Sequence, residues 1–161
     1  MDPQDTAGGE AAEHGRIVDP PRGAPDVYAE AVLAVTGMIP PGHVLTYGDI
    51  AELLGCGGPR QVGRALSHST RSVPWWRVLR AGGHPASGLA DRARPHYDDE
   101  ATPLRAPEDP AGPGDYRVDL GRARWWPTTA EQTVIAGLGA SRRSANDEPR
   151  TRVSVREPDV R

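Results

Sequence analysis

The arginines between positions 53 and 90 are the most concentrated chemical feature of this sequence. The whole chain has a formal net charge of −3, from 19 basic and 22 acidic residues. Residues 53–90 nevertheless contain no Asp or Glu, and they hold Arg60, Arg64, Arg71, Arg77 and Arg80. Guanidinium groups bind phosphate oxygens, and the local charge governs attraction to nucleic acid more than the total does. The stretch predicts a nucleic-acid-binding surface, and a solvated basic surface without a ligand is the alternative.

Covalent and metal chemistry have little support in the residue types. Cys56 is the only cysteine, which excludes an intrachain disulfide and a cysteine-based zinc site. No Ser/His/Asp arrangement stands out, and His43 and His68 are expected on the surface. We therefore predict no cofactor and no metal.

Three short helices are expected to position the arginines. Asp26 can cap the first, whose apolar positions are Val27, Ala31, Val32 and Val35. Thr46 and Asp49 form a capping-box pattern at the start of a second helix, which Gly55 can end.

The third helix is predicted over residues 59–67, because Pro59 suits a first helical turn. Its arrangement directs three polar side chains outward: Arg60, Gln61 and Arg64. Two short helices joined by a Gly-containing turn are typical of a helix-turn-helix.

The rest of the chain is predicted to add little regular structure. Residues 76–80 and 116–120 read as short strands, and residues 84–115 as irregular. Residues 1–25 and most of 128–161 are predicted to be disordered tails, with a short helix possible around 129–138. The expected fold is thus mostly α with a minor β element, in one domain over residues 26–127.

The N-terminus is acidic and polar, and no run of about 18 apolar residues occurs. We expect neither a signal peptide nor a membrane span, and a cytoplasmic, nucleoid-associated location.

Three segments resemble the DNA-binding domain of O6-alkylguanine-DNA alkyltransferases, and still more the alkyltransferase-like proteins, which lack the acceptor cysteine. They are IPPGHVLTYGDIAELLG (39–55), PRQVGRALSHS (59–69) and VPWWRVLRAGG (73–83), in the family's order and spacing. The segment YRVDLGRARWWP (116–127) also resembles the alkyltransferase-like tail. The resemblance covers residues 27–127 and is weak in 84–115. It implies a winged-helix-like helix-turn-helix domain, as in the alkyltransferase C-terminal domain.

The resemblance also implies that the chain is not an enzyme. True alkyltransferases carry Pro-Cys-His-Arg-Val, in which an activated thiolate attacks the alkyl carbon. Here the motif is Pro74-Trp75-Trp76-Arg77-Val78, so Trp75 replaces the nucleophile and Trp76 its activating histidine. The second replacement departs from the commoner Pro-Trp-His-Arg of the alkyltransferase-like proteins.

The remaining motif residues imply DNA binding through a helix-turn-helix in the minor groove. Arg60 matches the arginine finger that fills the gap left by a flipped nucleotide, and Tyr47 the tyrosine that crowds the 3′ phosphate. Gly63 permits close approach of the helix, and Ser69 matches a polar residue that braces the pocket. The DNA-binding residues implied are Tyr47, Arg60, Gln61, Gly63, Arg64 and Ser69.

The implied alkylguanine pocket has Trp75 as a flat wall for the purine. Its residues are Tyr47, Pro74, Trp75, Arg77 and Val78. The family also places a basic residue near the O6 atom, for which Arg92 and Arg94 are the candidates.

Packing alternatives stay open for several of these residues. Tyr47 could simply pack at a helix start, and Arg60 could be solvated. One tryptophan of the motif, Trp76 in particular, could belong to the core, and Arg77 could hold the pocket loop. Trp125 and Trp126 read as packing anchors.

Three functional hypotheses follow. The first is a monomeric, non-enzymatic sensor that binds duplex DNA containing O6-alkylguanine and flags it for nucleotide excision repair proteins, a partnership implied by the resemblance alone. The second is a helix-turn-helix regulator that reads sequence and ignores the lesion. The third is an enzyme, either a hydrolase or an alkyl acceptor at Cys56.

Overall fold

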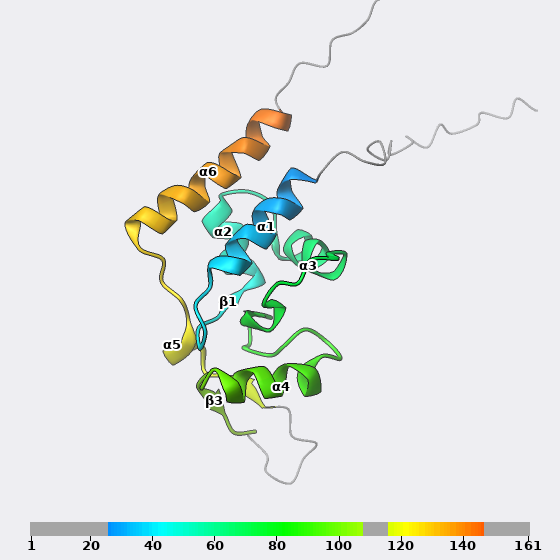
Figure 1. Cartoon of the computed structure of the whole chain (residues 1–161), viewed down its shortest axis with the longest axis vertical. Coiled ribbons are helices and arrows are strands. Elements are labelled where there is room, and N and C mark those ends of the chain that lie inside the picture. The colour runs from blue at the N-terminus through cyan, green and yellow to red at the C-terminus, as the bar shows by residue number, and fades with distance from the viewer. Residues whose placement is uncertain (1–25, 108–115, 147–161) are drawn as a thin grey trace, which may run out of the picture.

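The computed structural model describes residues 26–107 and 116–146, and it is mostly helical (Figure 1). The helices are α1 (Val27–Met38), α2 (Tyr47–Leu54), α3 (Pro59–Ser67), α4 (Ala90–Asp99), α5 (Leu120–Ala123) and α6 (Thr129–Asn146), with the 3-10 turn η1 (Trp75–Arg77). The strands are β1 (Leu45–Thr46), β2 (Val78–Leu79), β3 (Leu104–Arg105) and β4 (Arg117–Val118). The predicted fold class is confirmed. The tail predicted over residues 1–25 and the part of the predicted 128–161 tail from residue 147 onward lie outside the described residues.

Local capping determines where the first helices begin. The Asp26 side chain accepts hydrogen bonds from the backbone N–H groups of Tyr28 and Ala29, at 3.0 and 3.2 Å. These bonds satisfy donors that the first helical turn leaves free. Val32 and Val35 are fully buried on the inner face of α1, whereas Val27 is exposed and does not share that face.

The helix-turn-helix of α2 and α3 has the predicted capping residues. Thr46 Oγ1 accepts from Asp49 N–H at 3.1 Å, and the Asp49 carboxylate accepts from Thr46 N–H at 2.9 Å. Gly55 ends α2 with φ +66°, a left-handed conformation that favours glycine. Pro59 begins α3, and Arg60, Gln61 and Arg64 are exposed on it as predicted.

The strands are shorter than predicted. Of residues 76–80, only Val78–Leu79 form a strand, β2. Trp76 and Arg77 belong to the 3-10 turn η1, which begins after Pro74. Of residues 116–120, only Arg117–Val118 form a strand, since Asp119 caps α5. Strand β1 pairs with β2 in parallel, and β3 pairs with β4 antiparallel.

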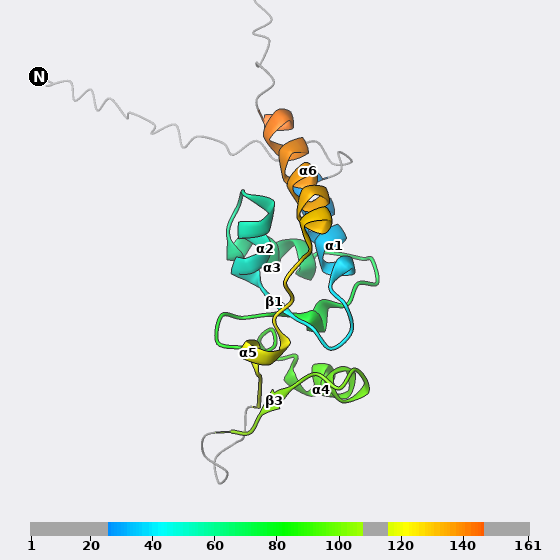
Figure 2. The ribbon, with the colours of Figure 1, turned by 90° about the vertical axis from the view of Figure 1, so that its left-hand side faces the viewer.

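Two hydrophobic clusters form the core, one at each end of the domain (Figure 2). Helices α1, α2, α3 and α6 surround the larger cluster, which contains Val32, Ile50 and Val62. The smaller cluster lies between α4 and the β3–β4 pair and contains Tyr97 and Val118. The β1–β2 pair joins the two, because Leu45 and Val78 belong to the larger cluster and Leu79 to the smaller.

Helix α4 corrects the prediction that residues 84–115 are irregular. It contains Pro95, and most of its side chains are polar or charged. Only Ala93 and Tyr97 are buried, one helical turn apart, and they anchor the helix on the smaller cluster. Because the segment contains a proline and has only a narrow apolar face, its sequence lacks the hydrophobic periodicity from which a helix is predicted.

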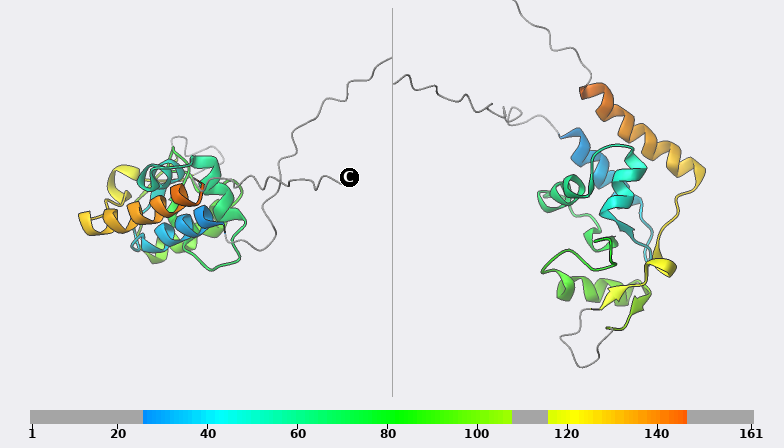
Figure 3. Two further views of the ribbon diagram at one scale, coloured as in Figure 1. Left: turned by 90° about the horizontal axis from the view of Figure 1, so that it is seen from above. Right: turned by 180° about the vertical axis from the view of Figure 1, so that it is seen from behind.

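Helix α6 corrects the predicted end of the folded domain at residue 127. Its 18 residues extend well past the short helix considered at 129–138, and it runs alongside α1 (Figure 3). Ile135 is fully buried, and Gly139 lies against the backbone of Leu54, leaving no space for a side chain. Within residues 26–107 and 116–146, no helix is long and apolar enough to cross a membrane.

The two adjacent tryptophans near the C-terminal end have different environments. Trp125 is buried in the larger cluster, as predicted for a packing anchor. Trp126 is 77% exposed, so the prediction that it is also a packing anchor is wrong. The backbone there is extended, with Trp125 N–H bonded to Val44 C=O, and successive side chains therefore point to opposite sides.

Candidate nucleic-acid interface

A cavity of about 260 Å³ opens between α3, η1 and the start of α4. Its volume lies just below the range of about 300–1,000 Å³ that is usual for small-ligand sites, and its lining is a mixture of apolar and polar residues. The lining residues are Tyr47, Gly63, Leu66, Ser67, Ser69, Arg71, Val73, Trp75, Ala86, Leu89 and Arg92. Segments from both halves of the domain therefore build one site.

Tyr47 forms one side of the cavity, directly after the capping residue Thr46. A Cβ atom built on Gly63 would lie 3.8 Å from Cε1 of Tyr47, so the ring packs beside the bare backbone of α3. Partial burial raises the pKa of the Tyr47 hydroxyl above its usual value of 10.0, although the guanidinium of Arg80 opposes that rise. The hydroxyl is thus a neutral donor at physiological pH.

Trp75 forms another wall of the cavity. The Cζ atom of Arg92, in α4, lies 5.8 Å from the centroid of the Trp75 ring, within the range of a cation–π interaction. The ring of Trp76 meets Trp75 edge-on at 5.8 Å and an interplanar angle of 86°. The cavity therefore combines a flat aromatic surface with a positive charge.

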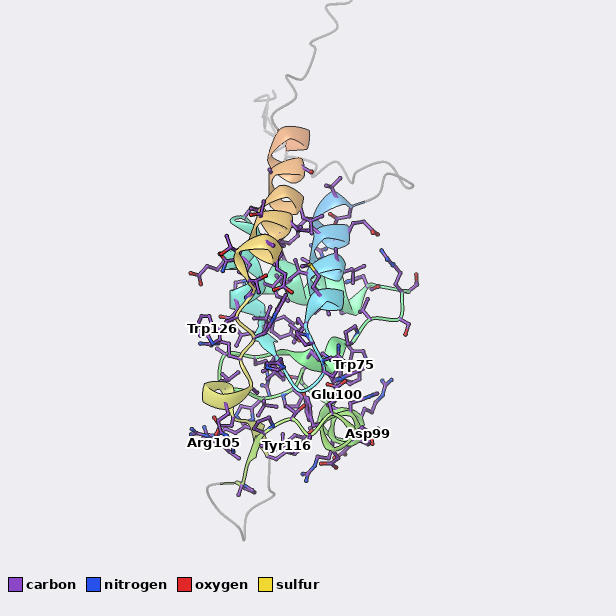
Figure 4. All side chains as sticks on the ribbon, turned by 60° about the vertical axis from the view of Figure 1, so that its left-hand side comes forward. Trp75, Asp99, Glu100, Arg105, Tyr116 and Trp126 are labelled. Atoms are coloured by element: carbon purple, nitrogen blue, oxygen red, sulfur yellow. The ribbon has the colours of Figure 1, made fainter. Side chains whose placement is uncertain are left out.

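Glu100, the C-cap residue of α4 (labelled in Figure 4), organises a polar cluster with Trp76 and Arg77. The Trp76 indole N–H donates to Glu100 Oε1 at 3.0 Å, and Arg77 Nη2 donates to the same oxygen at 2.6 Å. Gly42 N–H donates to Glu100 Oε2 at 3.2 Å, and Arg77 Nη1 donates to Ile39 C=O at 2.7 Å. The Arg77 and Glu100 side chains are only 14% and 12% exposed, so the pair is well shielded.

The electrostatics of Glu100 follow from these contacts. Burial alone would raise the pKa of its carboxyl group, but the hydrogen bonds from Arg77, Gly42 and Trp76 outweigh burial and hold that pKa below its usual value. The carboxylate is ionised near neutral pH and holds the loop at Gly42, η1 and the end of α4 together.

Trp76 is also stacked on His96, with ring centroids 3.7 Å apart and an interplanar angle of 5°. Tyr97 adds a hydrogen bond from its hydroxyl to Trp76 C=O at 2.6 Å. Trp76 therefore faces α4 and lies behind the cavity, which agrees with the packing alternative for this residue.

The five arginines of residues 53–90, the stretch without Asp or Glu, have different environments. Arg77 is held by Glu100, and Arg71 forms an exposed ion pair of 2.6 Å with Glu30. Arg60, Arg64 and Arg80 are exposed, and within the described residues none of these three forms an ion pair. The basic surface therefore consists mainly of α3 and the residue after β2.

A second hollow, of about 450 Å³, lies on the other side of the 68–71 loop, between α1 and α3. Gln61 and Arg64 line it, and Ser69 borders both hollows. Asp26 and Glu30 also line it, which makes this hollow less favourable for a phosphate than the exposed arginines.

Several residues expected at the site come together at the cavity: Tyr47, Gly63, Ser69 and Trp75. Pro74 is half-buried in the turn beside Trp75. Arg77 and Val78, which we expected to line the pocket, lie elsewhere: Arg77 is engaged by Glu100, and Val78 is buried in the larger core cluster. Arg92 reaches the cavity, whereas Arg94 pairs with Asp98 at 3.0 Å and lies over the Tyr116 ring.

Sequence reasoning missed the apolar part of the lining and the polar cluster. Val73, Ala86 and Leu89 come from loops whose sequences have no periodicity, so no local signal marks them. Glu100 lies 23 residues from Arg77, and only the fold pairs them. His43 and His68 are exposed as expected, and the described residues contain no group of three or more His, Cys, Asp or Glu that could hold a metal.

Comparisons with known proteins identify the family to which this chain is related. Residues 27–101 match the family model for the 6-O-methylguanine DNA methyltransferase DNA-binding domain. The chain is 39% identical over 61 residues to the DNA base-flipping protein of Vibrio parahaemolyticus, a match that spans 36% of this chain and 61% of that relative. It is 32% identical over 103 residues to the DNA base-flipping protein of Escherichia coli, spanning 62% of this chain and 75% of that protein. It is 31% identical over 96 residues to alkyltransferase-like protein 1 of Schizosaccharomyces pombe, spanning 55% of this chain and 85% of that protein.

The chain belongs to the alkyltransferase-like family. A crystal structure of S. pombe Atl1 in complex with damaged DNA containing O6-carboxymethylguanine is similar to this alkyltransferase-like chain, with a TM-score of 0.54 and 29% identity. The match covers 63% of this chain and 97% of that one. The alkyltransferase-like fold therefore accounts for the domain that carries the cavity, and the family model ends directly after Glu100.

Proposed function

We propose that this chain is a DNA-damage sensor that binds duplex DNA and accepts an O6-alkylguanine, rotated out of the helix, in the cavity beside Trp75. The observation that carries the proposal is the meeting of Tyr47, Gly63 and Trp75 at one cavity next to an exposed basic helix. An alkylated base inside the stack cannot be inspected until it is rotated out, so a reader needs both a DNA-binding surface and a pocket.

The surface of α3 suits close approach to DNA. Gly63 exposes bare backbone beside Tyr47, and Arg60 lies one helical turn earlier on the same side. In this proposal α3 enters the minor groove, where Arg60 replaces the flipped nucleotide in the stack and Arg64 and Gln61 bind the backbone. Ser69 lines the cavity and supplies a hydroxyl near the base.

The pocket suits recognition of a purine with an O6 substituent. The purine would lie against the Trp75 ring, and the Arg92 guanidinium would face the O6 edge. An arginine is planar and always charged, so it can stack on the base or donate to its oxygen. Both groups bind the base without changing it.

No alkyl transfer is proposed at this site. Indole lacks the thiolate that attacks an alkyl carbon. Cys56 lies in the turn between α2 and α3, where its carbonyl accepts the Tyr28 hydroxyl, and it does not line the cavity. The bound lesion would therefore remain intact, and the proposed consequence is that the complex is presented to nucleotide excision repair proteins. In this proposal the sensor acts as a monomer at the nucleoid.

Lesion preference is the decisive test. The purified chain is titrated into two identical short duplexes, one with a single O6-methylguanine, and fluorescence anisotropy is measured at fixed moderate salt. We expect at least tenfold tighter binding to the lesion duplex, about 1.4 kcal/mol. Mass spectrometry of the recovered DNA and protein should show the alkyl group still on guanine. Equal affinities would refute the sensor, and a mass shift on Cys56 would support an enzyme instead.

A regulator that reads sequence is the second candidate, favoured by exposed Arg60 and Arg64 on a helix-turn-helix. It predicts one preferred operator and indifference to the lesion. Selection from a random duplex library distinguishes the two: a single enriched sequence with equal binding of damaged and undamaged copies would favour the regulator.

A further inference from the structure

Two exposed arginines of residues 53–90 lie outside α3, Arg71 and Arg80. Arg71 pairs with Glu30, which leaves Arg80. It directly follows β2, and it has no ion pair among the described residues. An exposed guanidinium without a carboxylate partner keeps its full charge available to a ligand. The position of Arg80 relative to the cavity indicates which kind of ligand its guanidinium can bind.

The pairing of β1 and β2 places Arg80 beside Tyr47. The strands run parallel, with Thr46 opposite Leu79. The residues that follow them, Tyr47 and Arg80, therefore lie at the same end of the strand pair. The effect of the Arg80 charge on the pKa of the Tyr47 hydroxyl agrees with this proximity. Tyr47 lines the cavity, and Arg80 therefore lies near its rim.

The turn after β2 fixes the direction of the Arg80 side chain. Arg80 N–H donates to His84 C=O and Gly83 N–H donates to Arg80 C=O, both at 2.9 Å. The Arg80 Nε donates to Pro85 C=O at 3.0 Å, and the next residue, Ala86, lines the cavity. The guanidinium is thus held toward the cavity loop, while its two Nη groups have no hydrogen-bond partner among the described residues.

We propose that Arg80 binds a backbone phosphate next to the flipped nucleotide, in the strand that carries the lesion. The inference rests on the proposed function, because it assigns the ligand of a residue at the rim of that same cavity. Rotation of a nucleotide into the cavity brings its own phosphates to the rim, where a pre-oriented guanidinium can bind two phosphate oxygens at once. Arg80 and α3 then bind the backbone from two separate elements of the domain.

The first test is the salt dependence of binding. Arg80→Gln removes the charge from an exposed side chain, and anisotropy titrations at several salt concentrations are compared with those of the unchanged chain. We expect about fivefold weaker binding to the lesion duplex at moderate salt, and a log–log slope smaller by about 0.9, as for the loss of one phosphate contact. Arg80→Lys should retain the slope, since it keeps the charge.

Arg122→Gln is the matched control, because Arg122 is an exposed arginine on α5, away from α3 in Figures 1 and 3. It should leave the slope unchanged. Thermal melts of all variants, which should agree within a degree or two, confirm that the fold is intact.

The second test locates the phosphate. Lesion duplexes are made with one neutral methylphosphonate linkage, placed in turn 3′ and 5′ of the O6-methylguanine. At the contacted linkage the unchanged chain should lose about fivefold in affinity, and Arg80→Gln should lose nothing further. An unchanged salt slope in Arg80→Gln, or equal losses in both proteins at both linkages, would overturn the inference.

Failure of the proposed function gives a different pattern. Equal affinity of the unchanged chain for damaged and undamaged duplexes refutes the sensor. The salt slopes measured on the undamaged duplex then still decide whether Arg80 binds a phosphate.

Discussion

The guanidinium of Arg92 lies over the indole ring of Trp75, with its Cζ atom 5.8 Å from the ring centroid. This contact joins α4 to the turn that carries the tryptophan pair, and it places a permanent positive charge on the wall of the cavity. The two residues are 17 positions apart in the chain, and the stack of Trp76 on His96 holds α4 in the place that the contact requires.

Arg92→Gln should weaken binding of the lesion duplex by about threefold to tenfold, since a partly exposed cation–π contact contributes about 0.5–1 kcal/mol and a lost hydrogen bond to the base adds to it. Binding of undamaged duplex should change little. Anisotropy titrations with both duplexes measure the difference. Arg94→Gln is the control, because Arg94 pairs with Asp98 and does not line the cavity. The same loss in both variants would mean that Arg92 contributes only general charge.

Trp76→His introduces the residue that the resemblance implies at this position, and it should destabilise this chain. The change removes the hydrogen bond to Glu100 and the stack on His96. We expect a loss of about 1–3 kcal/mol in the free energy of unfolding, measured by urea titration. Trp76→Phe retains an aromatic ring and should lose less. A histidine variant as stable as the unchanged chain would show that the Trp76 contacts contribute little.

Glu100→Gln should lower the free energy of unfolding by about 2–3 kcal/mol at pH 7, because Arg77 would keep its charge in a shielded site without a carboxylate. The effect should depend on pH. The folded-state pKa of Glu100 lies below its usual value of 4.5, so its ionised form stabilises the fold above that pH. This contribution is lost as the pH falls below about 4.5 through the folded-state pKa. Urea titrations between pH 3 and 7 should therefore converge for the two proteins at low pH, and a constant difference would contradict the assignment.

Ile135→Ala should cost about 2–4 kcal/mol of unfolding free energy, the range for truncation of a fully buried aliphatic side chain. The neighbouring Val134 is 56% exposed on the same helix, and Val134→Ala should change stability by less than about 0.5 kcal/mol. Equal small effects in both variants would mean that α6 does not belong to the cooperative unit.

Arg60→Ala should reduce lesion discrimination more than it reduces binding of undamaged duplex, because a side chain that fills the stack contributes only when a nucleotide has left it. The ratio of the two dissociation constants is the measured quantity, and it should fall at least threefold. Arg64→Ala, about one helical turn further along α3, should weaken both duplexes alike if Arg64 binds the backbone. A proportional loss on both duplexes in Arg60→Ala would remove the stacking role.

Local signals in the sequence predicted the first three helices well. The Thr46–Asp49 capping box, Gly55 and Pro59 act within a few residues of one another, so their effect does not depend on distant contacts. The same holds for the outward direction of the α3 arginines. Helices α4 and α6 were missed or shortened because few of their side chains are apolar, and each is held by contacts with residues far away in the sequence.

Only those site residues that belong to a recognisable sequence motif could be predicted. Trp75 and Tyr47 lie at the cavity as the resemblance implied, whereas Val78 lies in the core because strand pairing with β1 turns it there. Whether a tryptophan such as Trp126 is covered depends on the path of the neighbouring chain, which no local pattern encodes. Glu100 could not be found because its partners are brought to it by two distant segments, the loop at Gly42 and η1.

The parallel pairing of Thr46 with Leu79 joins positions 33 residues apart, with the whole of α3 in the intervening loop. Closing such a loop costs chain entropy before any contact between the two strands repays it, so the pairing should form late in folding. The cavity depends on residues on either side of this junction, and its walls should therefore appear together, when the two strands pair. A chain in which α3 has formed and the strands have not yet paired would therefore have the exposed arginine helix without the pocket.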